Sequence, residues 1–292
     1  MNWRAKMKND ISISTGGYKN LTGSQAIKYL KKNNILSIEL SGGKYSKNLV
    51  KQITHFNKNL NLRVHNYFPP PKDPFVINLA SEDKKILNKS INHIKKSILL
   101  VKKLGGDTYS FHAGFRVDPK FKTLGKKFEK IKMISKKKAL GNFIRQIKKI
   151  SKFAKKNKIN ILLENNVVTK KNLNIFRGNP FLLTNYKDVK NLFKFMPKNV
   201  KLLVDVAHLK VSAKTEELDP IKSLKIMNKY AEGYHFSENN GYDDSNDPFK
   251  KNAWFLPYIK KNLSYYSIEV YNASPKKLKN QINIIKRGLT AL

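Results

Sequence analysis

Eight short apolar runs, rich in β-branched and aromatic residues, alternate with lysine-rich segments whose apolar residues recur at helical spacing. Strand and helix patterns that alternate in this way indicate parallel βαβ units. Eight such units close a (β/α)8 TIM barrel, so the sequence predicts the α/β class and this fold. The predicted strands are 10–15, 35–41, 62–68, 108–115, 159–165, 201–208, 233–237 and 265–271.

The segments between the runs predict helices that turn apolar residues inward and lysines outward. A TIM barrel typically needs roughly 250 residues, and this chain has 292. We therefore predict one domain over residues 1–292. The predicted helices are 22–33, 44–58, 82–104, 138–157, 186–196, 218–230, 249–261 and 275–289.

Four acidic or imidazole side chains end or nearly end a predicted strand: Glu164, Asp205, His235 and Glu269, spaced 41, 30 and 34 residues apart. The C-terminal strand ends of a barrel converge on one mouth, so these side chains should meet there. Together they form a divalent-metal shell. Carboxylates suit Mg²⁺ or Mn²⁺ and the imidazole extends the choice to Co²⁺ or Zn²⁺, so the ligand set leaves the metal undecided. The chain has no cysteine, which excludes thiolate sites.

Three more histidines lie at the same predicted face of the barrel. His65 ends one strand, His112 lies near the end of the next, and His208 follows Asp205 by three residues. A histidine of this kind is as readily a packed, hydrogen-bonded residue as a ligand. A lone strand-end carboxylate is likewise as readily a cap or an ion-pair partner, but three carboxylates and one histidine at matching positions favour a shared site.

With these residues in place, the chain resembles the xylose isomerase-like TIM barrels, a family of sugar and sugar-phosphate isomerases and epimerases that also includes endonuclease IV. The resemblance is carried by Leu163-Glu164-Asn165, Asp205-x-x-His208, His235 and Glu269. It implies that Glu164, Asp205, His235 and Glu269 bind one divalent metal, as in the ketose 3-epimerase-like members. It also implies that His208 contacts the substrate.

The endonuclease-like branch of the family adds histidines on strands three and four, and His65 and His112 match them. This branch also has an Asp-x-His pair after the histidine of strand seven. Here Asp244-Ser245-Asn246 stands at that place, so the second histidine is missing. The resemblance therefore leaves room for a second metal on His65 and His112. A three-metal phosphodiesterase site lacks one ligand unless Asp243 or Asp247 supplies an oxygen in its place.

For an epimerase or isomerase, the difficult step is removal of a proton from a carbon beside a carbonyl or hydroxyl group. We assign this proton transfer to Glu164 and Glu269, which stand on different strands and could serve opposite sides of the substrate carbon. Other polar residues near the strand ends are candidates to bind substrate hydroxyls or an anionic group, although the lysines and Arg116 could equally be solvated surface residues. The predicted substrate-binding residues are His208, Asn165, Arg116, Lys210, Glu238 and Asp244.

The leading hypothesis is thus a metal-dependent isomerase or epimerase of a small sugar-like substrate, phosphorylated or not, that works through an enediolate. The alternative is an endonuclease IV-like zinc phosphodiesterase that acts on abasic DNA. A third hypothesis is that the barrel binds a ligand but does not catalyse a reaction on it. The sequence leaves the sugar undecided because specificity lies in loop shape.

A net charge of +39 is typical of nucleic-acid binding. However, only six of the 59 basic residues are arginine, and the lysines spread over nearly every predicted helix, so nucleic acid is the less favoured partner. No run of about 18 apolar residues is present and no apolar secretory segment follows Met1, so we expect a cytoplasmic protein without a membrane partner. Assembly into a homo-oligomer stays open.

Overall fold

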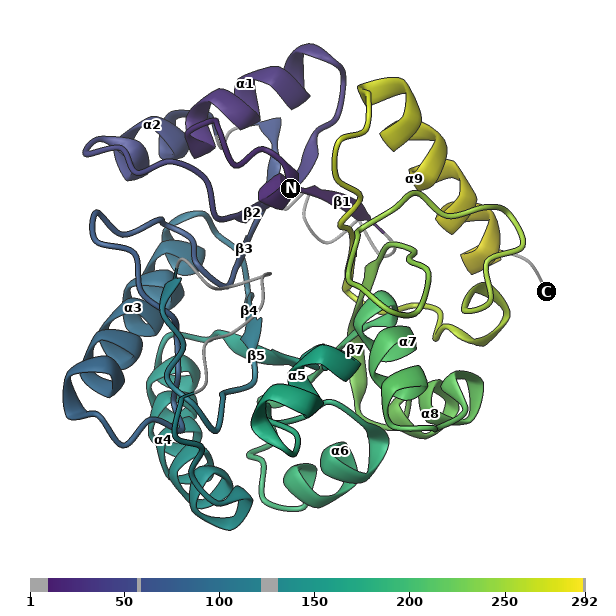
Figure 1. The fold of residues 1–292 in the computed structure, drawn as a ribbon. Helices are drawn as coiled ribbons and strands as arrows, with labels where there is room; N and C mark the ends of the chain where they lie inside the picture. The colour runs from purple at the N-terminus through teal and green to yellow at the C-terminus, as the bar shows by residue number, and fades with distance from the viewer. Residues whose placement is uncertain (1–9, 57–58, 122–130, 291–292) are drawn as a thin grey trace.

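A computed structural model describes residues 10–56, 59–121 and 131–290 of the chain. Its strands are all parallel and follow chain order around a closed barrel, in which β8 pairs with β1 (Figure 1). The predicted (β/α)8 barrel and its eight strands are confirmed. The strands are β1 Ile11–Ser14, β2 Ser37–Ser41, β3 Asn61–His65, β4 Thr108–His112, β5 Asn160–Glu164, β6 Val200–Asp205, β7 Ala231–Phe236 and β8 Tyr265–Ile268.

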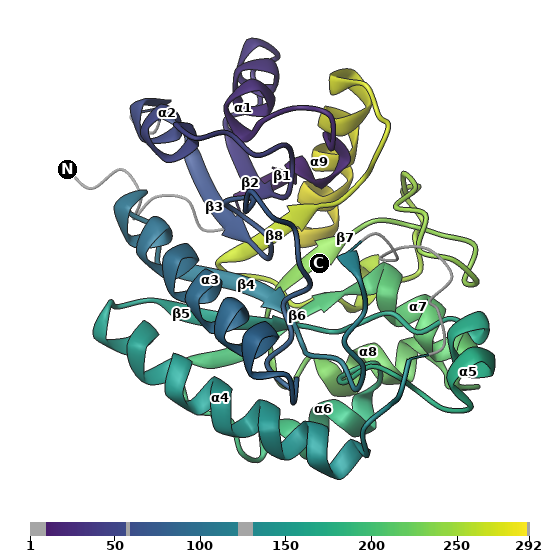
Figure 2. The ribbon, with the colours of Figure 1, turned by 60° about the vertical axis from the view of Figure 1, so that its left-hand side comes forward.

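Helices surround the barrel as an outer ring, and two views about 60° apart show them packed side by side around it (Figure 2). Seven of the eight predicted helices appear, with ends that differ by a few residues. The helices are α1 Gly23–Lys32, α2 Leu49–Phe56, α3 Lys84–Lys103, α4 Lys136–Lys156, α5 Lys170–Phe176, α6 Tyr186–Phe193, α7 Val206–Thr215, α8 Pro220–Met227 and α9 Pro275–Thr290, with short 3-10 helices η2 Thr15–Gly17 and η5 Leu256–Tyr258.

The helix predicted over 249–261 is wrong. Pro257 lies inside that segment, and proline removes a backbone donor and clashes with the preceding helical turn, so the chain forms η5 there instead. The backbone N–H of Phe249 donates to the Gln281 side chain at 2.8 Å, and the Gln281 amide donates back to the Phe249 carbonyl at 3.2 Å. The Gln281 side chain on α9 thus binds both backbone polar groups of Phe249.

The sixth strand ends three residues earlier than predicted. Its last residue, Asp205, is also the N-cap of α7, because its carboxylate accepts the backbone N–H of His208 at 2.7 Å. The apolar residues from 206 onward therefore belong to a helix that the sequence reading missed, and His208 lies in its first turn. The Asp205 carboxylate thus caps α7 and also lies at the barrel mouth.

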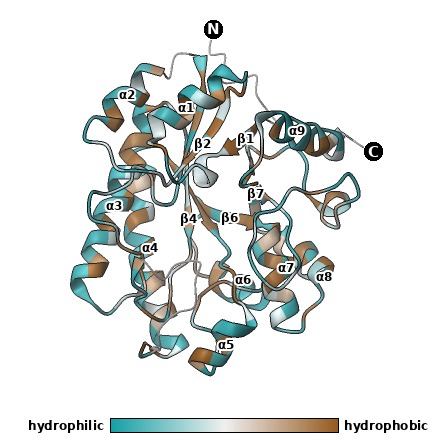
Figure 3. Cartoon of the chain, turned by 45° about the horizontal axis from the view of Figure 1, so that its top comes forward, coloured by the Kyte–Doolittle hydropathy of each residue, from teal (hydrophilic) through white to brown (hydrophobic). Residues whose placement is uncertain are grey.

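The main apolar core lies between the strands and the helices. In Figure 3 brown, hydrophobic residues occur on both strands and helices, and on the helices they alternate with teal, hydrophilic ones. On β2, Ile38 and Leu40 belong to this core together with Ile27 of α1. Residues of the alternate parity point into the barrel and are mainly polar. Ser12 and Ser37, for example, are buried and share a 2.9 Å hydrogen bond. Bulky apolar residues usually fill a TIM barrel, so this polar interior sets the chain apart.

Among the described residues, none of the helices combines the length and the apolar composition that a bilayer span requires. The residues after Met1, for which the sequence predicts no secretory segment, lie outside the described part of the chain up to residue 9.

Candidate metal centre at the barrel mouth

The four predicted metal ligands meet at the C-terminal mouth of the barrel. Glu164 and Asp205 are the last residues of β5 and β6, His235 is the penultimate residue of β7, and Glu269 directly follows β8. One ligand atom from each lies within 4.8 Å of the others, and all four residues are buried. The convergence of parallel strand ends thus gathers residues that lie as much as 105 positions apart in the sequence.

The donor set fits a divalent cation. Three buried carboxylates face one imidazole, and burying such charges is costly unless a counter-charge compensates them. Within the described part of the chain, Glu164 Oε2 and Asp205 Oδ2 are buried without a hydrogen-bond partner. Oxygen and imidazole-nitrogen donors in this combination suit Mg²⁺, Mn²⁺, Co²⁺ or Zn²⁺.

The two glutamates of this centre occupy different electrostatic environments. Burial, reinforced by the neighbouring carboxylates Glu164 and Glu39 against the opposing effect of His235, raises the pKa of Glu269 to about 8. Burial also acts to raise the pKa of Glu164, but His112, His235 and His65 together hold that pKa well below its ordinary value. The pair therefore combines one carboxyl that retains its proton with one that is ionised.

Two histidines extend the centre on the side of β3 and β4. His65 Nε2 and His112 Nδ1 each lie 3.3 Å from Glu164 Oε2. One ligand atom from each of the three residues lies within 4.8 Å of the others, so they form a second group that could hold a metal ion. Burial lowers the pKa of His65 to about 4, and it also lowers the pKa of His112. Neutral imidazoles of this kind are able to donate a lone pair to a metal.

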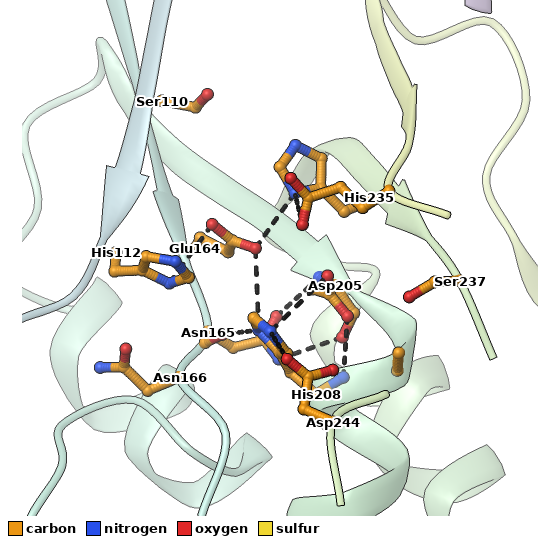
Figure 4. Close-up of polar contacts among 12 residues, drawn as sticks. Ser110, His112, Glu164, Asn165, Asn166, Asp205, His208, His235, Ser237 and Asp244 are labelled. Atoms are coloured by element: carbon orange, nitrogen blue, oxygen red, sulfur yellow. Dashed lines mark hydrogen bonds and ion pairs between the residues drawn. The ribbon is translucent and has the colours of Figure 1, made fainter. Parts of the chain in front are cut away.

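His208 and Asp244 complete the mouth on the side of α7 (Figure 4). His208 Nδ1 donates to the Asn165 carbonyl at 2.9 Å, and its Nε2 lies 3.2 Å from Asp244 Oδ2. Burial acts to lower the pKa of His208, but Asp205 and Asp244 raise it well above its ordinary value. The segment that carries Asp244 is held in place by paired backbone hydrogen bonds of 2.8 Å between Glu238 and Asp247.

The family model of the xylose isomerase-like TIM barrel matches residues 27–263. The chain belongs to this family.

Solved structures with the same fold include sugar epimerases, whereas no curated protein matches the chain. A D-tagatose 3-epimerase-like protein is 18% identical, with a TM-score of 0.68, over 97% of this chain and 97% of that chain. D-psicose 3-epimerase from Clostridium cellulolyticum H10 is 13% identical, with a TM-score of 0.67, over 97% and 99%. The 3-keto-D-glucoside 4-epimerase from E. coli is 12% identical, with a TM-score of 0.65, over 98% and 100%. At these identities the likeness shows the shared barrel fold.

Two predicted substrate-binding residues of this xylose isomerase-like barrel, Asn165 and Arg116, form hydrogen bonds with backbone groups of neighbouring segments. The Asn165 side chain bridges strands, since its amide donates to the Asp205 carbonyl at 3.1 Å and accepts the Asp205 N–H at 2.9 Å. Arg116 donates to the carbonyls of Ile134 at 3.0 Å and Asn179 at 2.7 Å. Both residues therefore have structural partners, and their contact with a substrate stays a prediction.

Lys210 and Glu238 form an ion pair of 2.7 Å, and the Lys210 ammonium also donates to the Asn239 carbonyl at 2.6 Å. The predicted contact of Glu238 and Lys210 with a substrate stays a prediction. Lys210 and Glu238 are half-buried, and they follow the C-terminal ends of β6 and β7.

One buried carboxylate of the xylose isomerase-like centre was missed in the sequence. Glu39, on β2, has no exposed surface, and its Oε2 lies 2.9 Å from His235 Nε2. We searched for site residues at strand ends, whereas Glu39 occupies the middle of the strand Ser37-Ile38-Glu39-Leu40-Ser41. The available signal was a charged residue within an apolar strand, which is rarely buried unless it is paired.

Proposed function

We propose that this chain is a divalent-metal-dependent sugar or sugar-phosphate isomerase or epimerase. The observation that carries the proposal is the buried group of Glu164, Asp205, His235 and Glu269, whose ligand atoms lie within 4.8 Å of one another. Its family and the sugar epimerases among its structural neighbours support the same class of reaction.

In this proposal the four residues hold one metal ion. When bound, the metal polarises the substrate carbonyl and offsets the negative charge that develops on its oxygens. Because the metal centre is buried, a substrate that reaches it exchanges most of its hydrating water for protein groups. His208, whose Nδ1 donates to the Asn165 carbonyl and whose Nε2 lies 3.2 Å from Asp244 Oδ2, is our candidate to donate a hydrogen bond from Nε2 to a substrate oxygen.

Glu164 and Glu269 carry the proton transfer. One carboxylate removes the proton from the carbon beside the carbonyl, and the electron pair of that C–H bond forms an enediolate. The other carboxyl returns a proton to the opposite face of the same carbon, which gives the epimer, or to the neighbouring carbon, which gives the isomer.

The test is exchange of solvent deuterium into ketoses, followed by NMR on protein loaded with Mn²⁺, Mg²⁺, Co²⁺ or Zn²⁺. The panel includes D-tagatose, D-psicose and L-ribulose, which the names of structural neighbours contain, and their phosphates. We expect Glu269→Gln to slow exchange by about 10²–10⁴-fold, the usual contribution of a positioned acid or base. Unchanged exchange in this variant would exclude the assigned role.

Glu232→Gln is the matched control. Glu232 stands near the start of β7, at the opposite end of the barrel from the mouth, so the same change of charge there should leave exchange unaltered. If the wild-type protein exchanges deuterium into none of the sugars with any of the four metals, the proposed reaction is wrong.

The alternative is a zinc phosphodiesterase acting on abasic DNA. Two observations favour it: the second group of Glu164, His65 and His112, and the 3.2 Å contact between His208 and Asp244. Asn246 stands where the endonuclease-like pattern has its second histidine, which weighs against this function. Cleavage of an abasic-site duplex by the zinc-loaded protein, with steep dependence on salt, would support it, and absence of cleavage would refute it.

A further inference from the structure

Glu39 is a fully buried carboxylate that the proton transfer does not use. It projects from the middle of β2 into the barrel, below the group formed by the strand-end ligands. A carboxylate with no exposed surface needs charge-assisted partners to offset its lost hydration. Its Oε2 has two such partners, His235 Nε2 at 2.9 Å and the Tyr265 hydroxyl at 2.5 Å.

The two ring nitrogens of His235 face different neighbours. Nδ1 lies 3.1 Å from Glu164 Oε1 and 3.6 Å from Glu269 Oε2, and so it is the nitrogen that faces the other candidate ligands (Figure 4). Nε2 faces Glu39 on the opposite side of the ring. A neutral imidazole can offer a lone pair at Nδ1 only when its proton is on Nε2. An acceptor at Nε2 therefore selects the tautomer that can bind a metal.

A chain of hydroxyl groups fixes Glu39 in this position. The Tyr265 hydroxyl, which donates to Glu39, also lies 2.8 Å from Ser110 Oγ, and Ser110 Oγ lies 3.0 Å from His65 Nδ1. The guanidinium of Arg63 stacks on the Tyr265 ring, 4.6 Å from its centroid. Tyr265 is itself buried, so its hydroxyl has little freedom to leave Glu39.

We propose that Glu39 is a positioning residue that holds His235 in the Nε2-protonated tautomer and directs Nδ1 to the metal. This inference rests on the proposed four-residue metal centre and extends it across the barrel to β2. Carboxylates that accept the distal N–H of a metal-bound histidine fix the ring orientation and increase its basicity, and their loss typically weakens metal binding by about 10–100-fold.

The same geometry has a competing interpretation. Glu39, His65 and His235 by themselves also form a group with metal-ligand geometry. Under that interpretation Glu39 would be a direct ligand, and His235 would present Nε2 to the ion. The two roles differ in stoichiometry, because a direct ligand of a separate ion takes one metal equivalent with it when it is removed.

The experiment compares the wild type with Glu39→Gln and Tyr265→Phe. Affinity and stoichiometry for Zn²⁺ and Co²⁺ come from titration against a chelator, and the visible spectrum of bound Co²⁺ reports the ligand geometry. Long-range ¹H–¹⁵N spectra of the zinc-loaded protein, assigned with His235→Asn, show which nitrogen of His235 carries the proton. Tyr265→Phe keeps the charge of the barrel interior and removes just the hydroxyl that holds Glu39.

Tyr266→Phe is the matched control. Tyr266 is the next residue on β8 and is equally buried, but its hydroxyl bonds to the backbone of Leu263 and Lys260, on the other face of the strand. We expect this variant to leave metal affinity, the Co²⁺ spectrum and the His235 tautomer unchanged.

We expect Glu39→Gln to weaken binding by about 10–100-fold at unchanged stoichiometry, with an altered Co²⁺ spectrum and loss of the pure Nε2–H tautomer. Tyr265→Phe should change the same quantities in the same direction by less. Affinity within about twofold of wild type with an unchanged tautomer, or loss of one metal equivalent, would overturn the proposal. None of these measurements needs turnover, so a wild type that binds metal but exchanges no deuterium refutes the proposed function and leaves this inference intact.

Discussion

Replacement of Glu269 by glutamine should change how the stability of the protein depends on pH. Burial and neighbouring carboxylates raise the pKa of Glu269 from 4.5 to about 8 in the folded chain. Between these two values the folded state binds more protons at this position than the unfolded state, so stability falls as pH rises. Glutamine cannot titrate, and the variant should lack this part of the decrease.

The size of the effect follows from the two pKa values. At 1.36 kcal/mol per pH unit, the folded chain holds this proton more tightly by about 5 kcal/mol. About 3–4 kcal/mol of this difference falls between pH 5 and pH 8. Asp205, whose pKa burial raises to about 6, and His235, whose pKa its carboxylate neighbours raise, add decreases of the same sign. These remain in the variant, except for the part of the His235 shift that Glu269 itself causes.

The assay is urea unfolding of both proteins at pH 5 and pH 8 in the presence of chelator, with fluorescence and circular dichroism followed together to check that the transition is two-state. The wild type should lose about 3–4 kcal/mol more than Glu269→Gln over this range. Saturating metal should remove the difference in slope, because the metal binds the ionised carboxylate. Parallel pH profiles of the two chelated proteins would refute the reasoning, whatever their absolute stabilities.

Two other predictions follow from the same structure. Since a metal must displace the proton of Glu269, affinity for Zn²⁺ or Co²⁺ should rise with pH up to about 8 and then level off, and a flat profile in a chelator titration from pH 6 to 9 would contradict this. Gly233→Ala should destabilise the barrel by about 1–3 kcal/mol in urea unfolding, because the added Cβ would lie 2.8 Å from Tyr265 Cβ and 3.0 Å from Leu203 Cδ1. Gly141→Ala in the exposed face of α4, where nothing lies within 4 Å, is the control and should stabilise by about 0.5–1 kcal/mol.

The barrel could be predicted from the sequence because its strands have a strong local signature. The strand residues that belong to the core are apolar and mostly β-branched, leucine or aromatic, and lysines mark the exposed side of the helices. The prediction failed where local pattern and tertiary contacts disagree. Residues 249–261 have helical spacing, but Pro257 and the bonds from Gln281 stop the helix, and the apolar run after Asp205 continues as α7 because the Asp205 carboxylate caps it.

The position of the centre could also be predicted, because parallel strand ends must converge whatever their side chains are. Sequence position alone does not indicate how each side chain is used. Asn165 has both of its polar atoms bound to the backbone of β6, and the Arg116 guanidinium binds backbone carbonyls, so the contacts of both are set by chain segments distant in sequence. The depth of Glu39 in the barrel depends on β2 facing β7 across the interior, which no local pattern encodes.

The charge distribution links these observations to the choice of substrate. The chain carries a net charge of +39, yet Glu39, Glu164, Asp205 and Glu269 are all buried and meet inside the barrel. A diffuse positive exterior attracts any anion at low salt, whereas an anionic group that reaches the barrel interior meets buried carboxylates. A cation held by the proposed centre would offset the charge of these carboxylates. It would also give an oxygen-rich substrate a positive point to bind, which the lysines outside the barrel cannot supply.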